Sequence, residues 1–580
     1  MTTIERNTTD ILILGSGGAG LFAALHAARA APELSITVAT KGLLGKCGCT
    51  RMVQGGYNVA LQPGDSVERH FMDTIEGGKW LPDQDLAWTL VTTAIERVRE
   101  LENEVGCFFD RNPDGTLHGK AFAGQTFDRT VHKGDLTGIE IINRLMEQVW
   151  SRPIGRLEEH RAVALVPDKA GESIAGVLMI DIRSGRFRFV QARAVLLATG
   201  GGPTMYRYHT PSGDKSMDGL CMAFRAGLGL RDMEMVQFHP TGLLAGMETR
   251  MTGTVLEEGL RGAGGHLLNG DGERFMKDYD PKAERATRDL VSRAITTEMR
   301  AGRTSPNGGV YIQMSHLGVD NVRKQFKGMV ERCADCGFDL AGGRVEVVPT
   351  AHYHMGGVLC APDTSTALAG LFVAGEDAGG VHGANRLGGN GVANSTVYGG
   401  IAGDTMPSWI TDNPYWRDPD DSIIEREVTR AQRPFDYPSG DINGLRERLL
   451  DVMWEDVGVI RNRADMERAL TELDELDAAL QRTGVLDTDR RFNMTWHDWL
   501  NLESQITASK IITRAALARE GSRGAHYRED FPDAGDLSTS TYTCATLDGE
   551  AVHIAHEPVK FTRIKPGETL LTDENLEAAE

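Results

Sequence analysis

Apolar and polar positions at the start of the chain fall into blocks that predict a strand, a glycine turn, a helix and a second strand. Residues 11–14 are all apolar, which is typical of a buried parallel strand. The run Gly15-Ser16-Gly17-Gly18-Ala19-Gly20 comes next, and a helix with a face of small residues begins after it. Residues 36–40 form the next apolar block, so the pattern predicts a βαβ unit of about thirty residues.

Similar patterns predict further elements along the chain. Residues 194–199 and 371–376 each indicate a buried strand. A helix is predicted over 141–149, with Thr137 and Glu140 as a capping box, and another over 391–402. Apolar residues recur at helical spacing over 445–480, which indicates an antiparallel helical bundle, and one more helix is expected over 500–520. Weak alternation from residue 536 onward predicts short strands.

The glycines of the first turn suit a nucleotide-binding turn. Gly15 permits the tight turn, Gly17 lets the backbone approach a pyrophosphate, and Gly20 lets the helix pack close to the strand. The helix N-terminus adds unpaired N–H groups and the positive end of the helix dipole. The second strand ends at Thr40 and Lys41 without the carboxylate that holds the ribose in NAD sites, so the sequence favours FAD. The alternative is a glycine-rich turn that binds nothing.

Composition restricts the class of protein. A chain of 580 residues is too long for one core, and about two to four domains are expected. The formal charge of −20 disfavours nucleic acid and anionic membrane surfaces as direct partners. No apolar run approaches the roughly eighteen residues of a membrane helix, and the polar start of the chain predicts no signal peptide. The eight cysteines include one CxxC, at Cys333 and Cys336, and are expected to be free thiols in a reducing cytoplasm, with no metal site.

Nine short motifs occur in an order that identifies a family. Together they resemble the flavoprotein subunit of succinate dehydrogenase and fumarate reductase, with L-aspartate oxidase as a close relative. The motifs include Gln54-Gly55-Gly56, Ala198-Thr199-Gly200-Gly201, Gln237-Phe238-His239-Pro240-Thr241-Gly242, Glu258-Gly259-Leu260-Arg261-Gly262, Arg288-Asp289, His352-Tyr353-His354-Met355-Gly356-Gly357 and His382-Gly383-Ala384-Asn385-Arg386.

The resemblance covers nearly the whole chain and implies an α/β fold. It implies a Rossmann-like FAD-binding domain over residues 1–240 and 347–415, and an inserted α+β capping domain over 241–346. A helical domain over 416–530 and a small C-terminal domain over 531–580 complete the chain. Family members transfer a hydride between the flavin and the β-carbon of a dicarboxylate, and exchange a proton at the neighbouring carbon.

The family's site residues map onto matching positions of this chain. His239, His352 and Arg386 match the groups that bind the substrate carboxylates, and arginine suits a bidentate grip of a planar carboxylate. Arg288 matches the proton shuttle, and Glu258 its relay. The expected cofactor contacts are Gly15, Gly17, Gly18, Ala19, Gly20, Thr40, Lys41, Cys49, Thr50, Gln54, Gly55, Gly56, Ala198, Thr199, Gly200, Gly201, Asp218, Glu376, Asn390, Gly391, Val392 and Ala393. No metal site is expected.

Two positions depart from the family pattern. Cys49 stands where succinate dehydrogenases carry the histidine bonded to FAD, so the sequence favours noncovalent FAD, with a thioether from Cys49 as the alternative. Glu257 replaces a threonine that hydrogen-bonds a substrate carboxylate. At an effective dielectric near 20 and roughly 4 Å, two anions repel by several kcal/mol. Glu257 is therefore turned away, protonated, or facing a substrate group such as an amine, amide or hydroxyl.

Three functions remain open. The leading interpretation is an FAD-dependent oxidoreductase that interconverts succinate and fumarate or a closely related small dicarboxylate. The alternatives are an L-aspartate oxidase and an electron-transfer flavoprotein subunit with an altered substrate site. The family often joins membrane-anchor subunits and an iron–sulfur subunit, which would place a cytoplasmic protein at the inner membrane through its partners.

Overall fold

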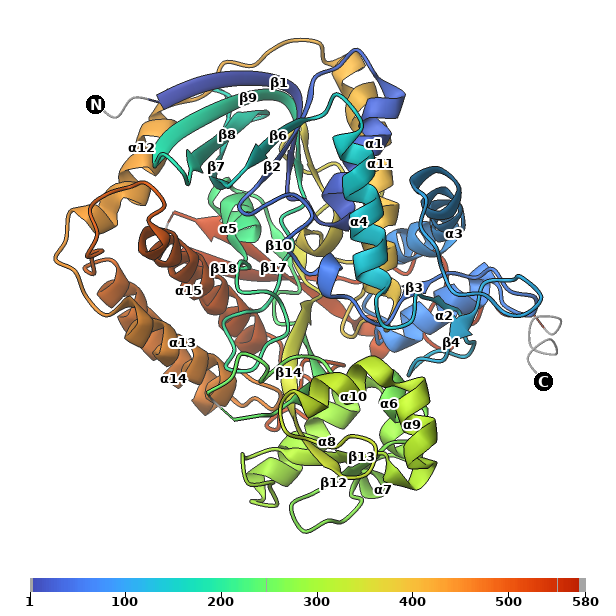
Figure 1. The fold of residues 1–580 in the computed structure, drawn as a ribbon. Helices are drawn as coiled ribbons and strands as arrows, with labels where there is room; N and C mark the ends of the chain where they lie inside the picture. Colours follow the sequence, from blue (N-terminus) through green and yellow to red (C-terminus); the bar gives the residue numbers. More distant parts are fainter. Residues whose placement is uncertain (1–3, 247, 550, 573–580) are drawn as a thin grey trace.

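The computed structural model describes residues 4–246, 248–549 and 551–572. Its first part is built on a seven-stranded sheet with strand order β6-β2-β1-β9-β8-β7, in which β16 also pairs with β9 (Figure 1). Strands β1, β2, β6, β9 and β16 pair in parallel, and β7, β8 and β9 pair antiparallel. The strands are β1 (Ile4–Leu14), β2 (Ile36–Thr40), β6 (Gly155–Glu158), β7 (His160–Pro167), β8 (Ile174–Asp181), β9 (Arg186–Leu197) and β16 (Leu371–Val373).

The centre of this sheet is buried on both faces. Leu12 and Leu14 of β1 pack into one hydrophobic core, and Ile11 and Ile13 into another on the opposite face. This explains why the first apolar block lacks alternation. The helices of this part are α1 (Gly18–Ala30), α2 (Val67–Gly77), α3 (Gln84–Glu100), α4 (Thr137–Trp150), α5 (Asp218–Arg225) and α11 (Asn390–Asp412), and a small sheet holds β3 (Tyr57–Asn58), β4 (Gly119–Lys120) and β5 (Thr130–Val131).

Helices α1 and α11 pack against each other through small residues. A Cβ at Gly399 would lie 2.5 Å from the Ala19 carbonyl oxygen, and one at Gly403 would lie 2.5 Å from that of Ala23. The small-residue face predicted for the first helix therefore brings α11 beside the glycine turn. The two helices therefore lie side by side (Figure 1).

The segment after β11 forms a separate lobe at the bottom of Figure 1. Its sheet has the order β11-β14-β13-β12. Because β11 and β14 are long and paired, they carry the chain out of the first part and back. The elements are β11 (Val236–Leu243), β12 (His266–Leu268), β13 (Val310–Gln313), β14 (Arg344–His354), α6 (Gly259–Gly262), α7 (Met276–Tyr279), α8 (Arg288–Arg300), α9 (Val319–Gln325) and α10 (Lys327–Ala334).

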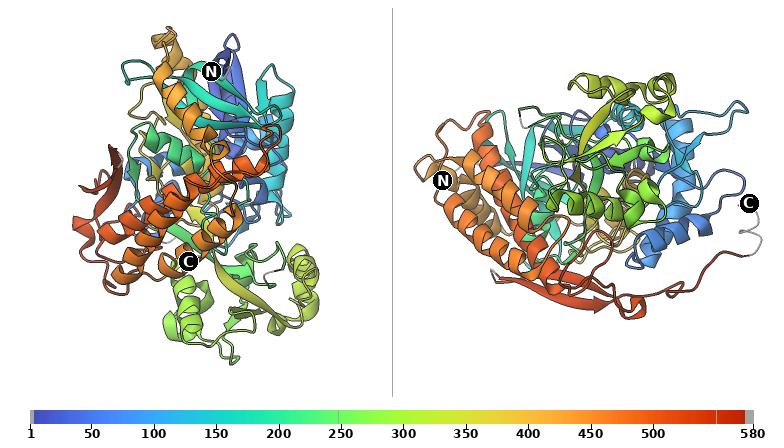
Figure 2. Two further views of the ribbon diagram at one scale, coloured as in Figure 1. Left: turned by 90° about the vertical axis from the view of Figure 1, so that its left-hand side faces the viewer. Right: turned by 90° about the horizontal axis from the view of Figure 1, so that it is seen from below.

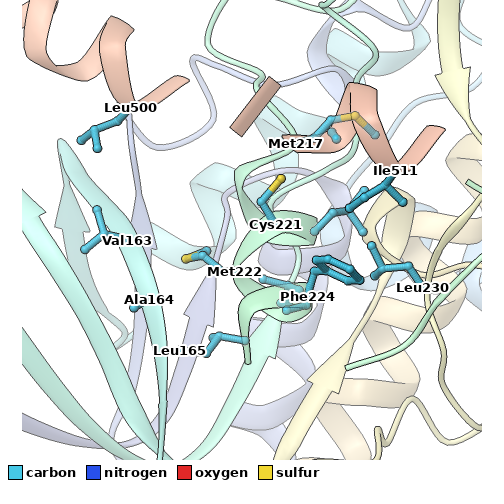
Figure 3. Close-up of a cluster of buried hydrophobic side chains, with 14 of the residues drawn as sticks. Val163, Ala164, Leu165, Met217, Cys221, Met222, Phe224, Leu230, Leu500 and Ile511 are labelled. Carbon is cyan, nitrogen blue, oxygen red and sulfur yellow. The ribbon is translucent and has the colours of Figure 1, made fainter. Parts of the chain in front are cut away.

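The third part consists of long helices and a C-terminal hairpin. Helix α15 crosses the front of the first part in the left view of Figure 2, with α13 and α14 beside it. Figure 3 shows how it joins the main core: Leu500 of α15 lies beside Val163 of β7, and Ile511 lies near Phe224 of α5 and Leu230. The elements are α12 (Asp421–Gln432), α13 (Ile442–Asp456), α14 (Arg463–Leu480), α15 (Met494–Ala518), β17 (Thr541–Asp548) and β18 (Ala551–Pro558), and the hairpin joins β10 (Leu230–Arg231) and β15 (Gly357–Val358) in a four-stranded sheet.

The structure corrects some sequence-based elements. Strand β1 begins at Ile4, seven residues before the predicted start, because its polar residues pair with the outer half of β9. The capping box at Thr137 and Glu140 is wrong: Thr137 is the first residue of α4, and the Glu140 carboxylate accepts from the Phe108 backbone N–H at 2.9 Å. Helix α11 continues ten residues past the predicted end at Ala402, although it contains Pro407.

Two of the predicted domain boundaries lie in strands that connect parts of the structure. Those at 240 and 346 fall within β11 and β14, the strands that connect the two parts. Residues 550 and 573–580 of the predicted C-terminal domain lie outside the described residues. The division into domains stays a prediction. No described helix combines the length and the apolar character that crossing a membrane requires.

Candidate active site

Two cavities meet at the end of the glycine turn. The larger has a volume of about 530 Å³ and the smaller about 60 Å³, and both are lined by Gly17, Gly48, Ala198 and Lys215. A cavity of about 300 to 1,000 Å³ is typical of small-molecule sites. The larger cavity extends from α1 to side chains of β11, β14 and α8, so it spans the first part and the inserted lobe.

The glycine turn fits the diphosphate of a dinucleotide. Gly15 has φ of +111°, and a Cβ there would lie 2.0 Å from the Ala198 carbonyl oxygen. Gly17 is the N-cap of α1 and provides no side chain to cap it, while Gly17, Gly18 and Ala19 line the larger cavity. The N-terminal end of α1 therefore points its dipole at the junction of the cavities, where an anion is favoured, although the Gly18 N–H already donates to Thr50 Oγ1 at 3.0 Å.

The smaller cavity holds the candidate nucleotide contacts Thr40, Lys41 and Asp218. Lys41 Nζ lies 3.0 Å from the Asp218 carboxylate. Strand β2 has no acidic residue at its end, and Asp218, the first residue of α5, brings a carboxylate to this position. Burial would raise the pKa of Asp218, but the cations of Lys41 and Arg161 hold it below its usual value. An ionised carboxylate is thus available to accept from a ribose hydroxyl.

Most of the predicted cofactor residues line one of the two cavities. Those of the larger cavity are Gly17, Gly18, Ala19, Cys49, Thr50, Gln54, Gly55, Gly56, Ala198, Gly200, Glu376, Gly391 and Val392. Gly15, Thr40, Lys41, Thr199 and Asp218 line the smaller one. Gly20, Gly201, Asn390 and Ala393 line neither of them.

The Asn390 side chain is bonded to other protein side chains and does not line either cavity. Its side chain bonds to Asn58 Nδ2 at 2.8 Å, to His70 Nε2 at 2.9 Å and to Thr74 Oγ1 at 3.0 Å. Gly20 acts by packing, since a Cβ there would lie 2.0 Å from the Gly15 carbonyl oxygen. Asn390 and Gly20 therefore support the residues that line the cavities without lining them.

Asp377 was missed by the sequence analysis. Its buried carboxylate accepts from the backbone N–H groups of Thr199 and Gly200 and from the Thr199 hydroxyl. It therefore holds the glycine run after β9 against the neighbouring strand. The only signal was its place beside Glu376, which itself accepts from the N–H groups of Gly202 and His354.

The two predicted histidines face each other in the larger cavity. The rings of His239 and His352 have centroids 5.4 Å apart. Burial, together with the charge of Arg288, lowers the pKa of each well below its usual value, so both rings are neutral. The Thr241 N–H donates to His239 Nδ1 at 3.3 Å, which leaves the ring proton on Nε2 as a donor. Thr210 Oγ1 fixes His352 through Nδ1 at 2.7 Å.

Arg288, Glu258 and Arg261 form a continuous charged chain. Arg288 donates to Glu258 Oε2 from Nε at 3.0 Å and from the guanidinium terminus at 2.5 Å, and to Gln237 Oε1 at 3.1 Å. Arg261 donates to the other oxygen of Glu258 at 3.2 Å. Burial would raise the pKa of Glu258, but the two guanidinium groups keep it below its usual value. The predicted shuttle and relay are thus in direct contact, and Arg261 extends them.

Arg386 is buried with unused hydrogen-bonding capacity. Its guanidinium lies 4.5 Å from the centroid of the Tyr353 ring and donates to the Leu387 carbonyl oxygen at 3.2 Å. Among the described residues its Nε has no partner. Burial, and then the charge of Arg288, lowers the pKa of Arg386 to about 10, so it remains a cation at neutral pH. Such a group is suited to bind an anion in the cavity.

Glu257 also lines this cavity, and its charge is balanced. Its Oε1 lies 2.9 Å from Lys120 Nζ, and the Glu257 side chain is only 5% exposed. The lysine comes from β4, far away in the sequence. An intramolecular cation was not among the alternatives considered for Glu257 from the sequence, and Lys120 carried no pattern that could have revealed it.

Comparisons with known proteins agree with this geometry. An FAD binding domain model matches residues 10–392, and a fumarate reductase flavoprotein C-terminal model matches residues 446–570. One subunit of the fumarate reductase (CoM/CoB) of Methanothermobacter marburgensis is 40% identical over 531 residues, covering 90% of this chain and 94% of that protein. The fumarate reductase flavoprotein subunit of Escherichia coli is 33% identical over 585 residues, covering 96% and 95%. A solved E. coli quinol fumarate reductase flavoprotein is similar with a TM-score of 0.91, at 31% identity over 97% of this chain and 99% of that one.

The fold and the cavity therefore define an FAD-binding oxidoreductase. More narrowly, the chain belongs to the family of succinate dehydrogenase and fumarate reductase flavoprotein subunits.

Proposed function

We propose that this protein binds FAD in the joined cavities and interconverts fumarate and succinate, or a closely related small dicarboxylate. The observation that supports this best is the contact between Arg288, Glu258 and Arg261 beside His239 in a cavity that continues to the glycine turn. Residues of the glycine turn, the loop over 48–56 and the start of α11 would hold the cofactor. When bound, FAD supplies two-electron transfer to or from the substrate C–C bond.

The substrate is oriented by cations and neutral donors. Arg386 binds one carboxylate, and Nε2–H of His239 donates to the acid from the other side of the cavity. His352 is fixed by Thr210 and presents its ring to the same space. Two neutral histidines stabilise an anion by hydrogen bonding without carrying a charge, which suits a site that must accept charge developing during the reaction.

Arg288 is proposed as the proton donor to the substrate carbon. A guanidinium rarely loses its proton, so a partner must return one at once. Glu258 Oε2 touches Arg288 at two atoms, and Arg261 touches the opposite oxygen. Arg261 in turn donates to the Glu284 backbone carbonyl oxygen. The hydrogen-bonded route for the proton therefore runs from Arg288 through Glu258 to Arg261.

We further propose that FAD is held without a covalent bond. Burial, followed by the charge of Glu376, raises the pKa of the Cys49 thiol to about 12, and it is the thiolate that would attack. Acid precipitation of the purified protein should leave all of the flavin in the supernatant. Flavin that stays with the polypeptide, and is lost from a Cys49→Ser variant, would establish the thioether instead.

We also propose that this chain works with partner subunits. The relatives are named as subunits, and one solved neighbour is a quinol-fumarate reductase with menaquinol. We propose that an iron–sulfur subunit carries electrons to or from this chain, and that partners place it at the cytoplasmic face of the inner membrane. Purification of the tagged chain from its own cells, followed by iron analysis of the copurifying proteins, tests this proposal.

A direct assay tests the activity. The yellow holoprotein should oxidise reduced viologen when fumarate is added, and should form succinate in a ratio of one to every two viologen molecules. Rapid oxidation of aspartate by oxygen with release of ammonia would instead establish the oxidase. If fumarate does not cause oxidation of reduced viologen by the wild-type holoprotein, the proposal is refuted.

A further inference from the structure

Glu257 places an acceptor atom in the larger cavity that no group of the described residues uses. Its Oε1 is paired with Lys120 Nζ at 2.9 Å. Within residues 4–246, 248–549 and 551–572, no hydrogen bond reaches its Oε2. The side chain is 95% buried, so Oε2 is shielded from bulk solvent except through the cavity that Glu257 lines. Oε2 is accessible from the cavity, so a ligand that donates a hydrogen bond can reach it.

Lys120 holds this carboxylate from one side. Its Nζ donates to the Gly134 carbonyl oxygen at 2.8 Å as well as to Glu257, and Lys120 itself does not line the cavity. Two of its three donor positions are thus committed to protein atoms. The ion pair neutralises Glu257 without presenting the ammonium group to a substrate, so the atom that the substrate meets is an oxygen acceptor.

The cations of the cavity are distributed unevenly around it. Arg288 is compensated by Glu258, and Lys120 by Glu257. Arg386 has no acidic partner within 4.0 Å among the described residues, and its Nε is unbonded. Arg51, Lys215 and Arg332 also line the cavity and have no carboxylate within 4.0 Å among the described residues, so the feature that distinguishes Glu257 is its free acceptor and not a shortage of cations. A second carboxylate placed against Glu257 would meet an oxygen of like charge.

We propose that Glu257 determines specificity, and that this pocket prefers four-carbon acids with one carboxylate and a hydrogen-bond donor at the other end. The donor is the N–H of a carboxamide or the O–H of a hydroxyl. This inference rests on the proposed function and extends its substrates from dicarboxylates to four-carbon acids in which a hydrogen-bond donor replaces one carboxylate. For the monoamide of fumarate the step is reduction of C=C: two reduced viologen molecules give two electrons, solvent gives two protons, and the product is the monoamide of succinate.

Two substrates separate the two kinds of donor. The monoamide of fumarate carries N–H, and 4-hydroxycrotonate carries O–H; fumarate is the reference. The measured quantity is the ratio of kcat/KM for each donor substrate to kcat/KM for fumarate. A ratio above one is expected in the wild type for at least one of them. Ratios below one for both would overturn the proposal.

Variants then assign the preference to Glu257. Glu257→Gln keeps the shape but removes the charge, and the ratio should fall about tenfold or more, since hydrogen bonds to charged groups are the strong ones. The matched control is Glu331→Gln, on the exposed face of α10, which should leave the ratio unchanged. An unchanged ratio in Glu257→Gln with flavin fully bound contradicts the proposal.

A second variant covers the case in which Glu257→Gln does not fold. Lys120→Met leaves the Glu257 carboxylate uncompensated, so activity with fumarate should fall more than activity with the monoamide, and the ratio should rise. A fall would contradict the role assigned to Glu257.

Binding without turnover separates this inference from the proposed function. Titration of oxidised holoprotein, followed by the flavin absorption spectrum, should show tighter binding of the monoamide of malonate than of malonate. That preference can hold even if fumarate is not reduced, in which case only the proposed function fails. Tighter binding of malonate would overturn the inference even if fumarate is reduced.

Discussion

The cofactor end and the substrate end of the cavity are built in different ways. The cofactor end is mainly backbone: a glycine turn, a helix N-terminus and glycine runs that bring main-chain atoms close together. The substrate end is made of charged and aromatic side chains from β11, α8, β14 and the segment before α11. The first should therefore be sensitive to an added Cβ, and the second to a changed functional group.

The strongest test of this difference is an added methyl group. A Cβ at Gly15 would lie 2.0 Å from the Ala198 carbonyl oxygen, and φ of +111° is unfavourable for alanine. Gly15→Ala should yield protein with no bound FAD and therefore no activity, measured as the ratio of flavin to protein. The control is Gly213→Ala, where a Cβ would meet nothing within 4 Å. Full flavin content in Gly15→Ala would contradict the backbone account.

At the substrate end, a conservative change of one side chain should remove the reaction but not the cofactor. Arg288→Lys keeps the positive charge but loses the paired contacts with Glu258 and Gln237. We expect kcat to fall by about 10³, within the range for loss of a general acid, with flavin content unchanged. Arg293→Lys, on the same helix but bonded to Gly524, is the control. A loss of less than tenfold would rule out Arg288 as the proton donor.

The difference between local and remote contacts also explains which features could be predicted from the sequence. Local patterns were enough for the glycine turn, because its strand, turn and helix follow one another in the chain, although Gly15 also lies against Ala198 of the remote segment after β9. Lys120 and Asp377 could not be found in this way, because each acts on a segment remote in sequence: Lys120 on Glu257, and Asp377 on the run after β9. The polar start of β1 was missed for the same reason, since its partner lies in β9.

The resemblance to a family supplied what patterns could not. Its ordered motifs named His239, His352 and Arg386, which are far apart in the chain but line one cavity. It also marked Glu257 as a departure, without indicating the ion pair that makes it tolerable. Position-by-position comparison thus locates a site well, but the charge balance at a changed position depends on neighbours that only the fold brings together.

A smaller effect is expected where a side chain supports the cofactor end. Lys41 Nζ lies 3.0 Å from Asp218, whose carboxylate would otherwise rely on Arg161 at 3.9 Å. Lys41→Met should weaken FAD binding about tenfold, because a partly buried acid loses its nearest cation. The measurement is the dissociation constant for FAD from quenching of flavin fluorescence on adding apoprotein. Lys46→Met, at an exposed position of the same loop, should bind FAD normally.

The smallest expected effect is the absence of a histidine step in the pH profile. The pKa values of His239 and His352 lie well below the usual value, so both rings remain neutral as pH falls from about 8 to about 6. Protonation would begin only at lower pH, where a charged ring would stop acting as the neutral donor that Thr241 and Thr210 fix in place. We therefore expect no histidine step in kcat/KM for fumarate across this interval, and a change near pH 7 would belong to Glu376, whose pKa burial raises to about 7. An acid limb near pH 6.5 that disappears in His239→Gln would show that a histidine titrates in the free enzyme, and that the substrate end is better hydrated than its burial indicates.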